Sequence, residues 1–207
     1  MSTIWENTNA VVVAPDHNPS KTLQEFLVWA RKKPDGVNFG SAGVGTTPHL
    51  AGELFRVQTG IKATHVPFRG AAESIPALLS GTVDFAIDNV GSYSSMLKAG
   101  KARALALTSP ERWPTLPDVP TMAEAGVANF IVTSWDAFVM PAATPPAIVA
   151  KLSEAMRAIA ADPAVQQRFM GAGARIIAST PQETAAFAGR ERRKWSEVVR
   201  VSGAKLQ

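Results

Sequence analysis

A glycine-rich segment at residues 38–49 gives the clearest chemical signal in the sequence, and it reads NFGSAGVGTTPH. An apolar run precedes it and a run with helical spacing follows, so we expect it to join a strand to a helix. Gly43 and Gly45 let bare backbone approach a ligand, and Thr46 and Thr47 offer hydroxyl groups at the helix start. Free N–H groups and the helix dipole attract a carboxylate or phosphate there. The same pattern is equally typical of a tight connection that binds nothing.

Sharper interpretations of this segment fail on spacing. The glycine order G-x-x-G-x-G reverses the dinucleotide-binding pattern and no G-K-[ST] follows, so nucleotide binding is not supported. Ser41 has Phe39 at the position where a nucleophile elbow would need its first glycine. His49 and Glu53 are one helical turn apart without a third ligand, which predicts a surface ion pair and no metal site. We expect His65 in the core or at a strand end, and His17 in a solvated turn.

Two further informative segments lie at the C-terminal ends of predicted strands, VPFRGA at residues 66–71 and FAIDN at residues 85–89. In open α/β sheets, ligands bind at the carboxyl edge of the strands. Five residues should therefore cluster with the glycine turn: Phe68, Arg69, Gly70, Asp88 and Asn89. Arg69 could attract an anion, and Asp88 could receive an amine or hydroxyl group. Each could equally be a loop residue that caps the following helix.

The elements that must position these residues alternate between short β-type runs and helical stretches, which predicts an α/β fold on a largely parallel sheet. Strands are expected at residues 10–14, 37–41, 62–68, 83–88, 103–108 and 130–140. Helices are expected at residues 22–32, 48–58, 71–79, 92–98, 122–125, 146–161, 163–171 and 182–202. Pro76 predicts that its helix starts late or kinks. Prolines at 141, 145 and 146 mark a boundary between residues 1–140, the ligand-binding lobe, and residues 141–207, a helical segment.

Composition narrows the class of protein. Hydrophobic residues make up 46% and charged residues 18%, as in ordinary globular proteins. The net charge of +4 is too small to imply nucleic acid, and the basic groups at residues 31–33 and 190–194 favour solvated helix faces over a phosphate patch. Cysteine is absent, which excludes thiolate chemistry and disulfides. No apolar run is long enough to span a bilayer, and residues 1–10 lack a signal-peptide pattern, so an exported form would be mature or shortened.

Ordered motifs then make the resemblance specific: NFGSAGxGTxxHLAGELF, HVPFRG, FAIDN, KARALALTS, LPDVPTMAEAG and TSW. Together they resemble the Bug family of tricarboxylate transporter binding proteins, over about residues 9–201. The resemblance implies a two-lobed periplasmic binding protein of the second type that holds carboxylates between its lobes. It also implies a carboxylate turn in the second lobe formed by Ser41, Ala42, Gly43, Gly45, Thr46 and Thr47. Asp88 would select polar substituents, and Ser134 and Trp135 would lie on the strand that returns to the first lobe.

One departure from the family is large. A typical member begins with a signal peptide and a first lobe whose opening loop clamps the ligand, and nothing in this chain corresponds to them. The resemblance therefore implies an α/β second lobe with a mainly parallel sheet, plus C-terminal helices that normally complete the first lobe, here incomplete. A transcriptional effector domain can share this fold, but a helix-turn-helix would have to precede it and only nine residues precede the first predicted strand.

The leading hypothesis is a periplasmic protein that binds a small organic carboxylate for a tripartite tricarboxylate-type transporter. It predicts no enzymatic activity, cofactor, metal or nucleic acid. The alternative is an interaction or dimerisation module derived from the same fold. This alternative rests on an apolar helical stripe formed by Ile148, Leu152, Met156 and Ile159. The stripe would normally pack against the first lobe, and without that partner it should favour self-association.

Overall fold

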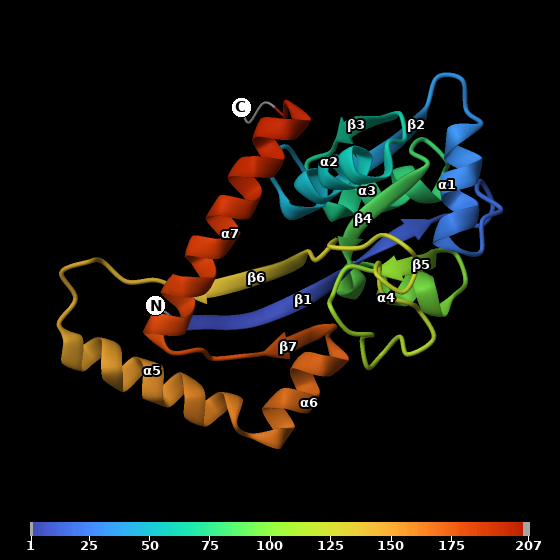
Figure 1. Ribbon diagram of the computed structural model, residues 1–207. Helices are drawn as coiled ribbons and strands as arrows, with labels where there is room; N and C mark the ends of the chain where they lie inside the picture. The colour runs from blue at the N-terminus through green and yellow to red at the C-terminus, as the bar shows by residue number, and fades with distance from the viewer. Residues whose placement is uncertain (1, 205–207) are drawn as a thin grey trace.

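The computed structural model describes residues 2–204, in which seven strands form one sheet and seven helices pack around it (Figure 1). The strands are β1 (Ser2–Val13), β2 (Val37–Ser41), β3 (Ala63–Pro67), β4 (Phe85–Asn89), β5 (Arg103–Leu107), β6 (Thr133–Phe138) and β7 (Ala174–Ile176). The helices are α1 (Leu23–Arg31), α2 (Thr47–Thr59), α3 (Ala71–Leu79), α4 (Val90–Lys98), α5 (Pro146–Ala160), α6 (Pro163–Gly171) and α7 (Pro181–Ser202).

Strand β1 is the axis of the sheet. Its second half pairs antiparallel with β4 and β5, and its first half pairs antiparallel with β6 and β7. Strand β2 is parallel to both β3 and β4, which gives the order β3-β2-β4-β1-β5. Strands β2 to β5 therefore share one direction, which confirms the largely parallel α/β fold, and β1 runs against them.

The core lies on both faces of the sheet because side chains of β1 alternate between them. Val11 and Val13 belong to the cluster beneath α1 and α2, whereas Ala10 and Val12 belong to the cluster beneath α3 and α4. The helix predicted at residues 22–32 is present as α1, and four of its residues are buried: Leu23, Phe26, Leu27 and Ala30. The edge of the sheet where β2 and β4 end is thus supported from both sides.

Two sequence predictions about elements are wrong. The first strand begins at Ser2 and not at Ala10, because its polar first half pairs with β6 and β7, which lie far along the chain. Residues 122–125 form a turn and not a helix, closed by the bond from the Val127 N–H to the Met122 carbonyl, 2.8 Å. Of the two outcomes predicted from Pro76, the late start is not seen, since α3 starts at Ala71, and the kink stays a prediction. Strand β7, with three residues, was not predicted at all.

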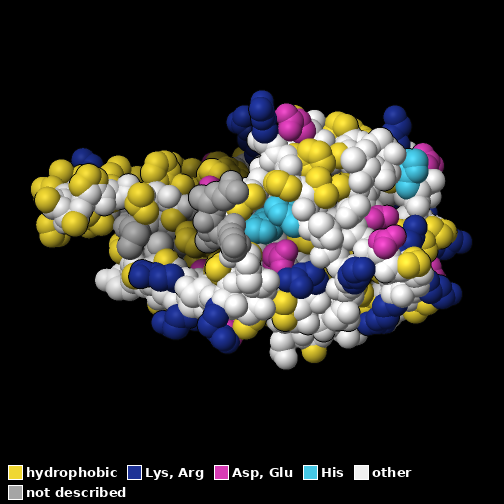
Figure 2. Space-filling model, turned by 90° about the horizontal axis from the view of Figure 1, so that it is seen from above, with side chains coloured by type: hydrophobic (Ala, Val, Ile, Leu, Met, Phe, Trp, Pro, Cys, Tyr) yellow, Lys and Arg dark blue, Asp and Glu magenta, His cyan; other side chains and the backbone are white. Residues whose placement is uncertain are grey.

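The C-terminal segment exposes apolar surface. Ile148, Leu152 and Ile159 of α5 are 49%, 46% and 57% exposed, and Phe138 at the end of β6 is 58% exposed. Figure 2 shows hydrophobic side chains gathered at the left end of the molecule, where Figure 1 places the connection from β6 to α5. The proposed division at residue 140 stays a prediction, and β7 from the second part pairs with the first half of β1. Among residues 2–204, no helix has the length and apolar character needed to cross a bilayer.

Candidate functional site

The glycine turn joins β2 to α2 as the sequence predicts. Ser41 ends β2, Thr46 is the N-cap of α2, and the first turn of α2 contains no acidic residue. Gly43 has a φ of 135° and Gly45 a φ of 80°, which L side chains rarely adopt. The glycines are therefore required by the path of the backbone, and the helix dipole at this end is not neutralised by a local carboxylate.

Much of the hydrogen bonding in this turn is internal. The Gly43 N–H donates to Ser41 Oγ at 3.1 Å, and Thr46 Oγ1 donates to the Gly43 carbonyl at 2.7 Å. The Gly45 N–H donates to His49 Nδ1 at 3.0 Å. Two N–H groups that the sequence suggested for a ligand are thus used to hold the turn in shape.

Other donors at the helix start remain uncommitted. Pro48 has no N–H, and the first bond of the helix runs from the Leu50 N–H to the Thr46 carbonyl at 3.1 Å. Within residues 2–204 the N–H groups of Val44, Thr47 and His49 donate to no protein acceptor. Val44 is 39% exposed, so the turn reaches the surface at this residue. Backbone N–H groups at a helix N-terminus are well suited to bind an anion.

His49 and His65 lie behind this turn, and the predicted surface ion pair between His49 and Glu53 is wrong. His49 is 4% exposed, and Glu53 instead pairs with Arg56 at 2.7 Å. Side chains in the first turn of a helix point back toward its N-terminus, which directs the His49 ring to the glycine turn. The ring stacks on His65 with centroids 4.0 Å apart, and His65 Nε2 lies 2.7 Å from Ser41 Oγ.

Both imidazole rings favour the neutral form. Burial lowers the pKa of His65 to about 4, and the neighbouring His49 adds to the effect. Burial also lowers the pKa of His49, while the Glu53 carboxylate opposes that shift. At neutral pH the pair therefore supplies hydrogen-bonding atoms and little positive charge. The third histidine, His17, lies exposed in a turn as predicted, with Nε2 3.1 Å from the Leu79 carbonyl.

The segment after β3 meets the same turn. The Phe68 N–H donates to the Ser41 carbonyl at 3.0 Å, and the Phe68 ring lies against Gly40. Arg69 is exposed, and its N–H donates to Glu73 Oε2 at 3.1 Å, a cap of α3. Gly70 is the N-cap residue of that helix. Phe68 thus adjoins the glycine turn, while the backbone of Arg69 and Gly70 serves the start of α3.

At the end of β4, Asp88 is 3% exposed, and its Oδ1 accepts the Asn89 N–H at 2.7 Å. Its Oδ2 and the Oδ1 of Asn89 have no hydrogen-bond partner among the described residues. Burial raises the pKa of Asp88 to about 6, opposed by the bond from Asn89. The carboxyl group is therefore partly protonated near neutral pH and can donate as well as accept hydrogen bonds.

The two β6 residues of the predicted site diverge. Ser134 Oγ donates to Asn9 Oδ1 at 3.3 Å, and Asn9 lies opposite Asn89 in the pairing of β1 with β4. Ser134 therefore joins the edge at which β4 ends. The Trp135 ring packs edge-on against Phe187 of α7, with centroids 5.1 Å apart. Trp135 thus faces the C-terminal helix.

Three residues that adjoin the predicted site were missed as members of it: Asn9, His49 and His65. His49 could have been found, because a histidine in the first turn after a glycine-rich loop points back at that loop. Asn9 and His65 could not, since their positions depend on pairing between distant strands. No group of three or more His, Cys, Asp or Glu side chains within residues 2–204 could hold a metal ion.

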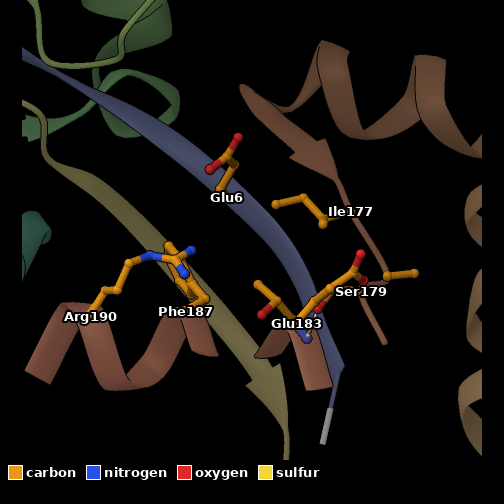
Figure 3. Close-up of a pocket in the computed structure, with 8 residues that line it drawn as sticks. Glu6, Ile177, Ser179, Glu183, Phe187 and Arg190 are labelled. Atoms are coloured by element: carbon orange, nitrogen blue, oxygen red, sulfur yellow. Dashed lines mark hydrogen bonds between the residues drawn. The ribbon is translucent and has the colours of Figure 1, made fainter. Parts of the chain in front are cut away.

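A cavity of about 460 Å³ lies elsewhere, between the first half of β1, β7 and the start of α7 (Figure 3). Arg190 reaches over the Phe187 ring at 5.9 Å from its centroid, and Glu6 lies across the cavity. Glu183 on the same wall is engaged by the Thr180 N–H and hydroxyl. No residue predicted for the site lines this cavity. It is therefore a separate place from the glycine turn.

Comparison with known proteins gives one consistent result. The family model described as the tripartite tricarboxylate transporter family receptor matches residues 2–204. Protein BugT from Bordetella pertussis is 33% identical over 186 residues, which cover 90% of this chain and 57% of BugT. This chain thus spans little more than half the length of that curated relative.

Solved structures agree. A structure of Rpa4515 from R. palustris with adipate is 31% identical with a TM-score of 0.90, over 98% of this chain and 67% of that one. The periplasmic binding protein BugD is 29% identical with a TM-score of 0.86, over 100% of this chain and 69% of that one. The fold described above is thus the fold of the matching part of these binding proteins.

Proposed function

The chain belongs to the tripartite tricarboxylate transporter receptor family, and from that premise we propose that it binds a small organic carboxylate for delivery to a transporter of this type. The observation that carries the proposal is the group of uncommitted N–H donors of Val44, Thr47 and His49 at the start of α2. One carboxylate group of the ligand would accept hydrogen bonds from them, favoured by the helix dipole. The adipate in the Rpa4515 structure supports a carboxylate as the ligand class.

Polar groups at the end of β4 would recognise the rest of the ligand. Asp88 and Asn89 each have a buried oxygen without a partner among the described residues, and Asn9 has such a nitrogen. Groups of this kind favour a ligand with hydroxyl, amine or second carboxyl substituents. Ser41 and Phe68 would form the wall between these groups and the glycine turn.

The cellular setting follows from the relatives. BugD is a periplasmic binding protein, so we propose a periplasmic location and a membrane transporter as the partner that accepts the ligand. The role is one of binding and delivery, without turnover of the ligand. Because the chain spans 57% of BugT, residues beyond this match are proposed to complete the clamp in such receptors. The 207-residue chain should therefore bind carboxylates weakly, with a dissociation constant of about 1 mM, which at 1 mM ligand adds only ~0.4 kcal/mol of stability.

A second candidate function is self-association through α5, either beside ligand binding or in place of it. The observation that favours it is the exposed stripe of Ile148, Leu152 and Ile159. A dimerisation module would still self-associate when the anion-binding turn before α2 is disrupted.

Calorimetric titration with adipate and with its neutral diamide tests the primary proposal. Adipate should bind and the diamide should not, since the N–H groups and dipole select negative charge. Val44→Asp should weaken adipate binding about tenfold by placing a carboxylate beside the donors. Val57→Asp is the matched control, because Val57 is a 41% exposed valine near the other end of α2. Equal binding of the diamide, or equal losses in the two variants, would refute the proposal.

A further inference from the structure

The first turn of α2 reaches back to hold the loop that precedes it. His49 is almost fully buried, and its Nδ1 accepts the Gly45 N–H at 3.0 Å. This bond constrains a residue whose φ of 80° is open to glycine alone in practice. Without an acceptor there, a glycine has many alternative conformations.

A second contact holds the other end of the same turn. Ser41 Oγ accepts the Gly43 N–H at 3.1 Å and lies 2.7 Å from His65 Nε2. The two imidazole rings stack with centroids 4.0 Å apart, so the contacts run from β3 through β2 to α2. Both glycines of the turn are therefore fixed by side chains that themselves support each other.

We propose that the His49 side chain positions the carboxylate turn, because its unprotonated Nδ1 fixes the Gly45 N–H and leaves the backbone N–H groups of Val44, Thr47 and His49 as the donors for ligand. The inference rests on the proposed function of this site. It assigns the His49 side chain a role through the backbone of the turn, with no direct contact between the imidazole ring and the ligand.

The role requires one tautomer of His49, with the ring proton on Nε2 and a free lone pair on Nδ1. Burial supports that state because it lowers the pKa of His49. The Glu53 carboxylate opposes the shift, but it is engaged by Arg56 at 2.7 Å. The His65 ring stacks on the His49 ring, so the two rings cannot both carry a positive charge without repulsion.

Two variants separate the contribution of the Nδ1 acceptor of His49 from that of the size and shape of its ring. In His49→Asn the amide oxygen occupies the place of Nδ1, one bond from Cγ, whereas His49→Leu has the same branching and no acceptor. Adipate affinity should fall about three- to tenfold in His49→Leu, the loss of one hydrogen bond, and stay within about twofold in His49→Asn. Equal affinity in wild type and His49→Leu, or equal losses in both folded variants, would overturn the inference.

A ligand-free measurement keeps this test separate from that of the proposed function. In the ¹⁵N-labelled 207-residue chain, a scalar coupling across the hydrogen bond should connect the Gly45 amide nitrogen to His49 Nδ1. If the coupling is observed but adipate does not bind, the proposed function is wrong and the hydrogen bond between Gly45 and His49 is still confirmed. Adipate binding without the coupling would overturn the inference alone.

Discussion

Asp88 shows how a single buried carboxyl group ties stability to pH. Its pKa is raised from 3.8 to about 6, first by burial, so the folded chain holds a proton that the unfolded chain releases between these values. The stability that this proton provides is present below pH 3.8 and is lost as pH rises through about 6. Asp88→Asn should therefore raise the free energy of unfolding at pH 7.5 by on the order of 2 kcal/mol, and by much less at pH 4.

Denaturant unfolding at the two pH values measures this effect. Asp35→Asn, at an exposed position, is the control and should change neither value. A destabilised Asp88→Asn protein at pH 7.5 would mean that the charged carboxylate is favoured by a partner, contrary to the burial seen here.

His65 produces the opposite dependence on pH. Its pKa is lowered from 6.5 to about 4, so below pH 6.5 the unfolded chain binds a proton that the folded chain resists. Stability should be complete above pH 6.5 and fall as pH drops toward 4. The groups that face this ring are His49 and Phe39 by stacking and Ser41 by hydrogen bonding, and Glu53 and Arg56 pair one turn further along α2.

Titration of the His65 ring carbon proton by NMR checks this prediction, and it should show a midpoint well below 6. His65→Gln should flatten the fall in melting temperature between pH 6.5 and 4.5. A midpoint near 6.5 would show that the ring is open to solvent and would weaken the account of the buried pair.

The residue types predicted where the glycine turn lies, but they did not predict which hydrogen bonds hold it. Gly43, Gly45, Thr46 and their place between a strand and a helix could be predicted, since backbone freedom and capping are local properties. The bond from Gly45 to His49 was not predicted, because His49 was assigned to a polar helix face. Burial of that face depends on β3 and His65, which come later in the chain.

At the scale of elements, α2 is placed by a glycine that the periodicity did not single out. A Cβ atom on Gly52 would lie 2.1 Å from the Phe39 ring of β2. The helix thus sits closer to the sheet than any larger residue allows, which holds its N-terminus over the end of β2. Gly52→Ala should destabilise the fold by about 1–3 kcal/mol despite the better helix propensity of alanine.

Gly189→Ala is the matched control within α7. The nearest atom to an added Cβ there is the end of the Arg193 side chain at 3.9 Å. This variant should gain up to about 1 kcal/mol. Thermal unfolding of the two variants gives the comparison, and a stable Gly52→Ala protein would show that α2 can move off the sheet at little cost.

Elements with strong periodicity were predictable and those made by long-range pairing were not. The helices expected from local sequence at residues 22–32 and 182–202 are both present, as α1 and α7. The first half of β1 contains Glu6 and Asn7 and has no apolar alternation, so only its partners β6 and β7 make it a strand. Three-residue β7 carries too little sequence to indicate a strand.

At the scale of the whole molecule, α5 presents apolar surface that other elements leave exposed. Ile148, Leu152, Ala155 and Ile159 are all exposed and follow the 4-3-4 spacing of a helix-pairing seam. We expect the 207-residue chain to self-associate at micromolar concentration. Leu152→Glu should shift it toward the monomer, whereas Val28→Glu, at a 51% exposed position on α1, should not.

Light scattering coupled to size-exclusion chromatography measures the mass of the three proteins. A compact wild-type monomer across the micromolar range would contradict the prediction. A wild-type oligomer that Leu152→Glu leaves intact would place the interface elsewhere.

The central claim is that a carboxylate binds at the start of α2, and a crystal structure of this chain grown with adipate tests it most directly. The account predicts one adipate carboxylate within hydrogen-bond distance of the Val44 and Thr47 N–H groups, with the rest of the ligand toward Asp88 and Asn89. Adipate bound instead beside Arg190 in the cavity between β1, β7 and α7, with the glycine turn empty of ligand, would contradict it.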